Sequence, residues 1–149
     1  MSVLFKGGTI VNATGRYLAD VFADGSTIKA IGTDLDNPAD EIVDAKGKYI
    51  LPGAIDPHTH ISMPFMGTHA QDNYETGTIA AACGGVTCVV DFDLQQKGET
   101  LFEALERKKA LAEGKVCVDY SLHPAIMDPR PDVIAEVKKA CLEYGTPSF

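Results

Sequence analysis

Residues 53–60 have the sequence Gly-Ala-Ile-Asp-Pro-His-Thr-His and directly follow a short apolar run. Successive side chains of an extended strand alternate between its two faces, so we predict that Asp56, His58 and His60 point the same way. Two imidazoles that share a face at this spacing can bind one metal ion between them. The spacing therefore indicates a metal site at a strand end, although an H-x-H pair also occurs by chance.

Downstream of this segment, the chain alternates between apolar strand patterns and helix patterns. Strands are predicted to begin near residues 53, 86 and 116. Helices are predicted from about residue 131 and after two capping pairs, Asp72 with Glu75 and Thr100 with Glu103. Glycines at positions 84–85, 114 and 145 are expected to end these helices. The alternation favours a parallel α/β architecture, either an open doubly wound sheet or a (β/α)₈ barrel.

Polar side chains at the predicted strand ends favour the barrel. His58 and His60 end the first strand, Asp91 and Asp93 end the second, and His123 follows the third. A barrel collects such residues on one rim, where its active sites lie. The sequence has no glycine-rich dinucleotide or P-loop motif to support the doubly wound alternative. We therefore expect residues 53–149 to form strand–helix units of a TIM barrel.

Residues 1–52 have a different pattern, which predicts a small β layer. Short β-rich segments separated by Gly, Asn and Asp turns lie at residues 3–5, 9–11, 20–23, 27–31 and 41–43. Asp24-Gly25 between two of them is a hairpin signal. A layer of this size is only marginally stable by itself.

Length and charge limit the possible classes of protein. The 149 residues are too few for a complete barrel, which needs about 250. The net charge of −8, without a basic stripe, disfavours nucleic acid and anionic membrane as partners. No signal-peptide pattern and no apolar run of about 20 residues is present, so a soluble, cytoplasmic protein is expected.

The four cysteines, Cys83, Cys88, Cys117 and Cys141, contain no C-x-x-C pair. In a chain without a secretion signal, free thiols are expected rather than disulfides. Free cysteine is among the most frequently buried residue types, so we predict that all four are buried.

Several segments of the sequence resemble those of a known protein family. The resemblance is carried by PGAIDPHTH (52–60), MPF (63–65), ETGT (75–78) and AAACGGVT (80–87), with FKGGTIV (5–11) and GTPSF (145–149) at the two ends. Together these segments closely resemble the N-terminal portion of the dihydropyrimidinase/D-hydantoinase family of cyclic amidohydrolases. The resemblance implies that residues 53–149 are the first three βα units of a TIM barrel, truncated before its fourth strand. It also implies that residues 1–52 are the N-terminal part of a small β-sandwich that other parts of the protein complete.

The same resemblance implies a two-metal hydrolase. In the family, two divalent ions, usually Zn²⁺, are bridged by a carbamylated lysine, which is expected here immediately after Phe149. One ion also takes both histidines of the H-x-H strand, so only His58 and His60 are carried over as ligands. A hydroxide bridging the metals opens a dihydropyrimidine or 5-substituted hydantoin ring to an N-carbamoyl amino acid. The catalytic Asp is expected outside this chain, and the family implies a homotetramer acting in pyrimidine catabolism.

The surrounding residues suggest how a cyclic diamide would be bound. Met63 and Phe65 are candidates for an apolar wall near the metals, although ordinary barrel packing explains them equally well. Dihydroorotase-like relatives carry an Arg where this chain has Ser62, so a neutral ring fits better than dihydroorotate. Asp56 is a candidate for supporting the metal ligands by hydrogen bonding, or a strand-end turn residue.

His69 and His123 are interpreted as structural residues, and two alternatives to the hydrolase remain open. One is a non-catalytic dihydropyrimidinase-like scaffold protein, against which the presence of His58 and His60 argues. The other is an amidohydrolase that acts on allantoin.

Overall fold

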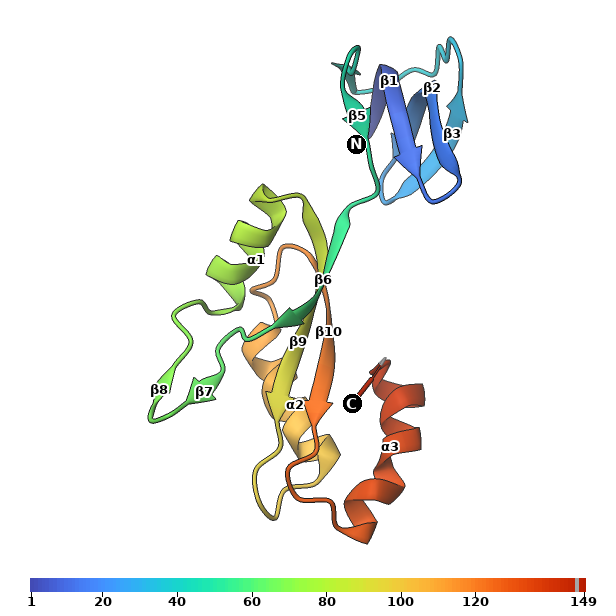
Figure 1. Ribbon diagram of the computed structural model, residues 1–149. Helices are drawn as coiled ribbons and strands as arrows, with labels where there is room; N and C mark the ends of the chain where they lie inside the picture. The colour runs from blue at the N-terminus through green and yellow to red at the C-terminus, as the bar shows by residue number, and fades with distance from the viewer. Residues whose placement is uncertain (147) are drawn as a thin grey trace. The chain divides into compact units, whose positions relative to one another are not determined.

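The computed structural model describes residues 1–146 and 148–149, and the chain divides into two units, Met1–Pro52 and Gly53–Phe149 (Figure 1). Pro147, which belongs to the closing segment of the resemblance, lies outside the described residues. No helix in the described part of the chain is long and apolar enough to cross a membrane.

The first unit is a single mixed sheet. Its strands are β1 (Ser2–Asn12), β2 (Gly15–Asp24), β3 (Thr27–Gly32), β4 (Glu41–Asp44) and β5 (Tyr49–Ile50). The order is β3-β2-β1-β4, with β5 also pairing β1. Strands β1, β2 and β3 are antiparallel neighbours, whereas β4 and β5 run parallel to β1. The predicted Asp24-Gly25 hairpin is confirmed, and Gly25 has the left-handed φ of 58° that such a turn requires.

A buried carboxylate fixes a bulge in this sheet. The β1–β2 register shifts between Phe5 and Gly8, where Gly7 has φ 69°. Asp20 accepts hydrogen bonds from the Lys6 ammonium at 2.6 Å and the Gly7 N–H at 2.7 Å. These donors, Lys6 first, hold the pKa of Asp20 below its usual value, so the carboxylate stays charged.

The second unit contains three successive strand–helix units. Its parallel sheet has the order β10-β9-β6, formed by β6 (Ala54–Thr59), β9 (Val86–Leu94) and β10 (Asp119–Ala125). The helices are α1 (Tyr74–Cys83), α2 (Leu101–Ala112) and α3 (Pro131–Tyr144), and a small hairpin of β7 (Pro64–Phe65) and β8 (Thr68–His69) precedes α1. The predicted parallel α/β arrangement is confirmed for these three strands, and the eight-stranded barrel stays a prediction.

Two predicted element starts are wrong by one to three residues. Strand β10 begins at Asp119 rather than near residue 116, because the Cys117 N–H bonds the Thr78 hydroxyl of α1 at 3.2 Å instead of joining the sheet. Helix α1 is capped by Asn73 with Thr76, not by Asp72 with Glu75.

The other predicted helix boundaries hold. Thr100 and Glu103 form the predicted capping box of α2. Gly145 ends α3 in the left-handed conformation, with φ 65°.

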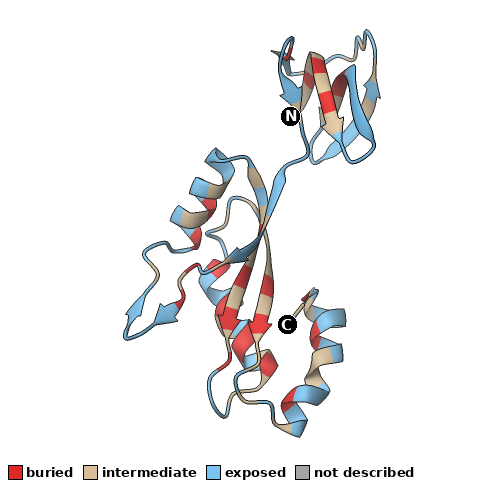
Figure 2. Cartoon of the chain, viewed as in Figure 1, coloured by how far each residue is buried: buried red, intermediate tan, exposed pale blue. Residues whose placement is uncertain are grey.

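Strand β9 separates two different environments. Val89, Asp91 and Asp93 are buried on the face that meets the helices, whereas the residues between them are only partly buried. Val89 packs with Ile61, Tyr74 and Ala112 in the core of this unit. Figure 2 shows this alternation as buried positions along β9 and β10 and on the helices that pack against them.

The prediction of four buried cysteines is wrong. All four are free, but Cys83, Cys117 and Cys141 are exposed and Cys88 is partly buried. The helix surfaces that carry Cys83 and Cys141 are not the ones that pack on the sheet: the buried positions of α1 and α3 are Tyr74, Thr78, Val133 and Ala140.

Candidate metal centre

The end of strand β6 brings His58 and His60, the residue that directly follows the strand, together on one face. Their ring centroids lie 5.1 Å apart, and both rings pack against Phe92 of β9, at 4.5 and 5.5 Å. Both histidines are exposed, and among the described residues no hydrogen bond to their ring nitrogens is recorded. The ring nitrogens are therefore available to a metal ion on the open face of the sheet.

A third imidazole, which sequence reasoning treated as merely structural, shares this face. His123 lies within β10, and its ring centroid is 4.4 Å from that of Phe92. Its Nδ1 is 2.6 Å from the Ser148 hydroxyl. The sequence placed His123 just after the third strand, near the same rim, but gave it no part in the site, whereas the structure places it inside β10. We name His58, His60, Phe92 and His123 the imidazole face.

Asp56 does not follow the alternation that predicted its direction. The β6–β9 register shifts between Asp56 and Thr59, so Asp56 pairs with Val89 and Thr59 pairs with Asp91. Pro57 has no N–H to donate to the ladder, which accounts for an irregularity at this point. The Asp56 carboxylate accepts a hydrogen bond from the His58 backbone N–H at 3.1 Å. It therefore contacts the backbone of a candidate ligand and not its ring.

Asp91 occupies the opposite face of the sheet and is fully buried. One carboxylate oxygen accepts from the Ile61 N–H at 2.8 Å and the Thr59 hydroxyl at 3.1 Å. The other oxygen lies 2.8 Å from the Lys108 ammonium and accepts from the Tyr74 hydroxyl at 2.7 Å. Burial, and then the nearby Asp91 charge, raise the pKa of Tyr74, so its hydroxyl remains a donor.

Asp93 shares this buried face but has a different partner. Its carboxylate lies 3.3 Å from the Arg107 guanidinium, which also pairs with Glu99 at 2.9 Å. The Oδ2 atom has no hydrogen-bond partner among the described residues. Burial raises the pKa of Asp93 to about 6, against the lowering effect of Arg107. The sequence placed Asp91 and Asp93 at the same rim as the histidines, but both carboxylates are turned away from the imidazoles, toward the helices.

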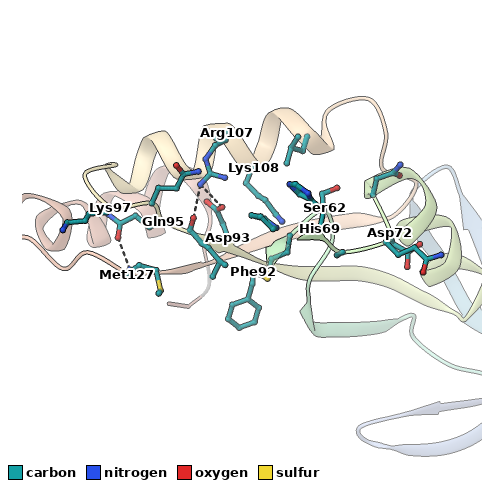
Figure 3. Close-up of a pocket in the computed structure, with 18 residues that line it drawn as sticks. Ser62, His69, Asp72, Phe92, Asp93, Gln95, Lys97, Arg107, Lys108 and Met127 are labelled. Carbon is teal, nitrogen blue, oxygen red and sulfur yellow. Dashed lines mark hydrogen bonds and ion pairs between the residues drawn. The ribbon is translucent and has the colours of Figure 1, made fainter. Parts of the chain in front are cut away.

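A cavity of about 890 Å³ lies on the helix side of β9, between α2 and the segment that precedes α1. Asp93, Arg107, His69 and Met63 line it, whereas His58 and His60 do not. Figure 3 shows Asp93 directed toward Arg107 while the Phe92 ring points away.

The two candidate substrate-binding residues are therefore separated. Met63 is buried, at 5% exposure, in the wall of this cavity, whereas Phe65 in the β7–β8 hairpin is 60% exposed. Their joint role as an apolar wall remains a prediction.

The residues present fit part of a metal site. Within residues 1–146 and 148–149, no group of three or more His, Cys, Asp or Glu side chains is arranged to hold a metal ion. Zinc sites in proteins use three or four protein ligands. Two adjacent, accessible imidazoles are therefore suited to supply two ligands, which is fewer than a complete zinc site needs.

Comparison with known proteins identifies the family of this chain. The model of the Amidohydrolase family matches residues 49–144. A D-hydantoinase of Geobacillus stearothermophilus is 47% identical over 149 residues, which are 100% of this chain and 32% of that protein. A dihydropyrimidinase of Rattus norvegicus is 42% identical, with 99% of this chain and 29% of that protein covered.

Solved structures agree with these matches. The crystal structure of dihydropyrimidinase from Brevibacillus agri NCHU1002 matches with a TM-score of 0.93 and 44% identity, covering 98% of this chain and 32% of that one. The chain thus spans about a third of the length of the relatives it matches. The resemblance to D-hydantoinases and dihydropyrimidinases extends over its whole length. The family match covers both the histidine strand and the three strand–helix units that position it, so this chain belongs to the amidohydrolase family.

Proposed function

We propose that the whole protein hydrolyses the ring amide of a dihydropyrimidine or a 5-substituted hydantoin, in a metal-dependent reaction that yields an N-carbamoyl amino acid. The observation that carries this proposal is the pair of accessible imidazoles, His58 and His60, 5.1 Å apart at the end of β6. The similarity to proteins named D-hydantoinase and dihydropyrimidinase supports the substrate class.

In this proposal, His58 and His60 hold a divalent metal, most simply Zn²⁺. When bound, such a metal lowers the pKa of water toward 7 and polarises a carbonyl oxygen. Phe92 packs against both rings and limits their rotation. Asp56 holds the backbone at His58, and Met63 with Phe65 are the candidates for contact with the substituent of the ring.

Other parts of the proposal rest on the family resemblance alone. They are a second metal ion, a bridging carbamylated lysine and a catalytic Asp, each supplied from elsewhere in the protein. They also include closure of the eight-stranded barrel, completion of the β-sandwich and assembly as a cytoplasmic homotetramer.

The test measures metal content and ring opening together. Full-length protein should open dihydrouracil or a 5-substituted hydantoin, lose this activity on chelation and regain it with zinc. His58→Ala and His60→Ala should each lower zinc content, because each removes one imidazole ligand. His69→Ala, the same change in the β8 strand, should keep the zinc content of the wild type.

Two outcomes would contradict the proposal. If the zinc content were unchanged in both His58→Ala and His60→Ala, the assignment of these histidines as metal ligands would be wrong. No turnover of either ring by zinc-loaded protein would remove the assigned reaction, and would favour an allantoin-like substrate or a non-catalytic scaffold.

A further inference from the structure

A buried polar cluster lies directly behind the imidazole face. Its members are Thr59 at the end of β6, Ile61 two residues beyond it, Tyr74 of α1, Asp91 of β9 and Lys108 of α2. Tyr74 and Asp91 are fully buried and the Lys108 side chain is 3% exposed. A buried ion pair stabilises a protein only when its remaining donors and acceptors are satisfied. In this cluster, the remaining donors and acceptors of the Asp91–Lys108 ion pair include bonds to the backbone beside His60, a candidate metal ligand.

Both peptide groups of Ile61 are held by this ion pair. Asp91 accepts from the Ile61 N–H at 2.8 Å, and the Lys108 ammonium donates to the Ile61 carbonyl at 2.5 Å. On the other side of His60, the Thr59 hydroxyl donates to Asp91 at 3.1 Å. The backbone is therefore fixed on both sides of His60.

Fixing Thr59 and Ile61 also fixes the direction of the imidazoles. Side chains alternate between the two faces of an extended segment. Residues whose position is fixed on the helix face therefore fix the direction in which their neighbours point on the opposite face. Thr59 lies between His58 and His60 in sequence and pairs with Asp91 across the sheet. A shift of this cluster would rotate the backbone that carries both rings.

We propose that Asp91, Lys108 and Tyr74 are positioning residues for the His58–His60 pair, acting through Thr59 and Ile61. The inference rests on the proposed metal-binding function of the pair. According to this proposal, the cluster determines how tightly the His58–His60 pair binds metal, in addition to any contribution that it makes to the stability of the fold. Groups that orient metal ligands typically change metal affinity about 10- to 100-fold when they are removed.

The experiment measures zinc affinity of the full-length protein by competition with a chromophoric chelator. Tyr74→Phe removes only the hydroxyl that binds Asp91, and Thr59→Val removes only the hydroxyl beside the histidines. Both should weaken zinc binding about 10- to 100-fold. Thr59→Ser keeps a hydroxyl and should restore affinity close to that of the wild type.

Tyr144→Phe is the control for the loss of a tyrosine hydroxyl, because Tyr144 ends α3 and stacks on Phe102 of α2, away from β6. It should bind zinc like the wild type. The melting temperature of the metal-free proteins separates the proposed role from a structural one, since a purely structural hydroxyl would change melting without a selective effect on zinc.

Each outcome is decisive. Weaker zinc binding in Tyr74→Phe and Thr59→Val, with metal-free melting like that of the wild type, supports the proposal. Zinc binding equal to that of the wild type in both variants overturns it and leaves the proposed function intact. Equal losses of affinity in these variants and in Tyr144→Phe would overturn it too. A wild-type protein that binds no zinc would overturn both.

Discussion

Replacing Lys108 by methionine should release the segment that follows the candidate ligands. The substitution keeps the length and much of the volume of the side chain but removes the ammonium from a site that is 3% exposed. Asp91 then stays buried with three donors, from Ile61, Thr59 and Tyr74, and without its counter-ion. The Ile61 carbonyl also loses its partner.

The expected cost follows from the geometry of the pair. At the observed 2.8 Å, the Coulomb attraction is about 6 kcal/mol for an effective dielectric constant of about 20. Most of that attraction only offsets the desolvation of the two ions, and breaking a buried pair by removing one partner costs about 3–5 kcal/mol. Because three donors remain on Asp91, we expect the lower end, about 3 kcal/mol.

Amide hydrogen exchange measures this loss locally. A local cost of about 3 kcal/mol corresponds to about 150-fold faster exchange of the Ile61 amide, since 1.4 kcal/mol is a factor of ten. Peptides covering residues 59–63 should show the change in mass spectrometry. Peptides from β1 belong to the other unit and should be unaffected.

Lys109→Met provides the matched control for this experiment. Lys109 is the next residue of α2, but its side chain is 45% exposed and its 3.3 Å partner Glu106 is at the surface. An exposed pair contributes about 0–1 kcal/mol, so exchange at Ile61 should change little. The reasoning is refuted if Lys108→Met exchanges at Ile61 no faster than Lys109→Met does.

Two further predictions concern the same unit. Burial raises the pKa of Asp93 from 3.8 to about 6, so the folded state holds this proton more tightly and stability falls as the pH rises from about 4 to about 6. Asp93→Asn removes a cost of about 3 kcal/mol at neutral pH, so its melting temperature relative to the wild type should be higher at pH 7.5 than at pH 4; a pH-independent difference would contradict this. Gly53→Ala would place a Cβ 2.1 Å from the Thr87 hydroxyl, and we expect it to destabilise the protein by about 1–3 kcal/mol. Adding Thr87→Gly should recover most of the loss in a chemical unfolding experiment, and no recovery would show that the close contact is not the cause.

Patterns with a strong period were predictable from the sequence. The three strand–helix units, the hairpin at Gly25 and the Thr100 cap follow from local rules of periodicity, turn conformation and capping. The proximity of His58 and His60 also followed from alternation. The direction of Asp56 did not follow from alternation, because Pro57 interrupts the hydrogen-bond ladder and the β6–β9 register shifts at this point.

Residues that meet only through tertiary packing were harder to predict. Lys108 carried one signal: it occupies the same helical stripe as the buried residues of α2, namely Leu101, Ala104, Leu105 and Ala112. A lysine at an apolar position of a helix indicates a buried counter-ion. Its partner, Asp91, could not be identified, because that choice depends on how α2 lies across β9.

The cysteines show the limit of composition rules. The tendency of a residue type to be buried is an average over many proteins. Cys83 and Cys141 are exposed because the packing of their helices buries other residues of α1 and α3.

The strict alternation along β9 makes this strand unusually intolerant of changes in length. Asp91 and Asp93 face Lys108 and Arg107, while Phe92 between them faces the imidazoles. Deleting or inserting one residue upstream of Asp91 would reverse the faces of these side chains, so the carboxylates would meet the histidines and the Phe92 ring would meet Lys108 and Arg107. Substitutions in β9 can therefore be accepted one at a time, but a single-codon deletion would damage the ion pairs and the imidazole face at once.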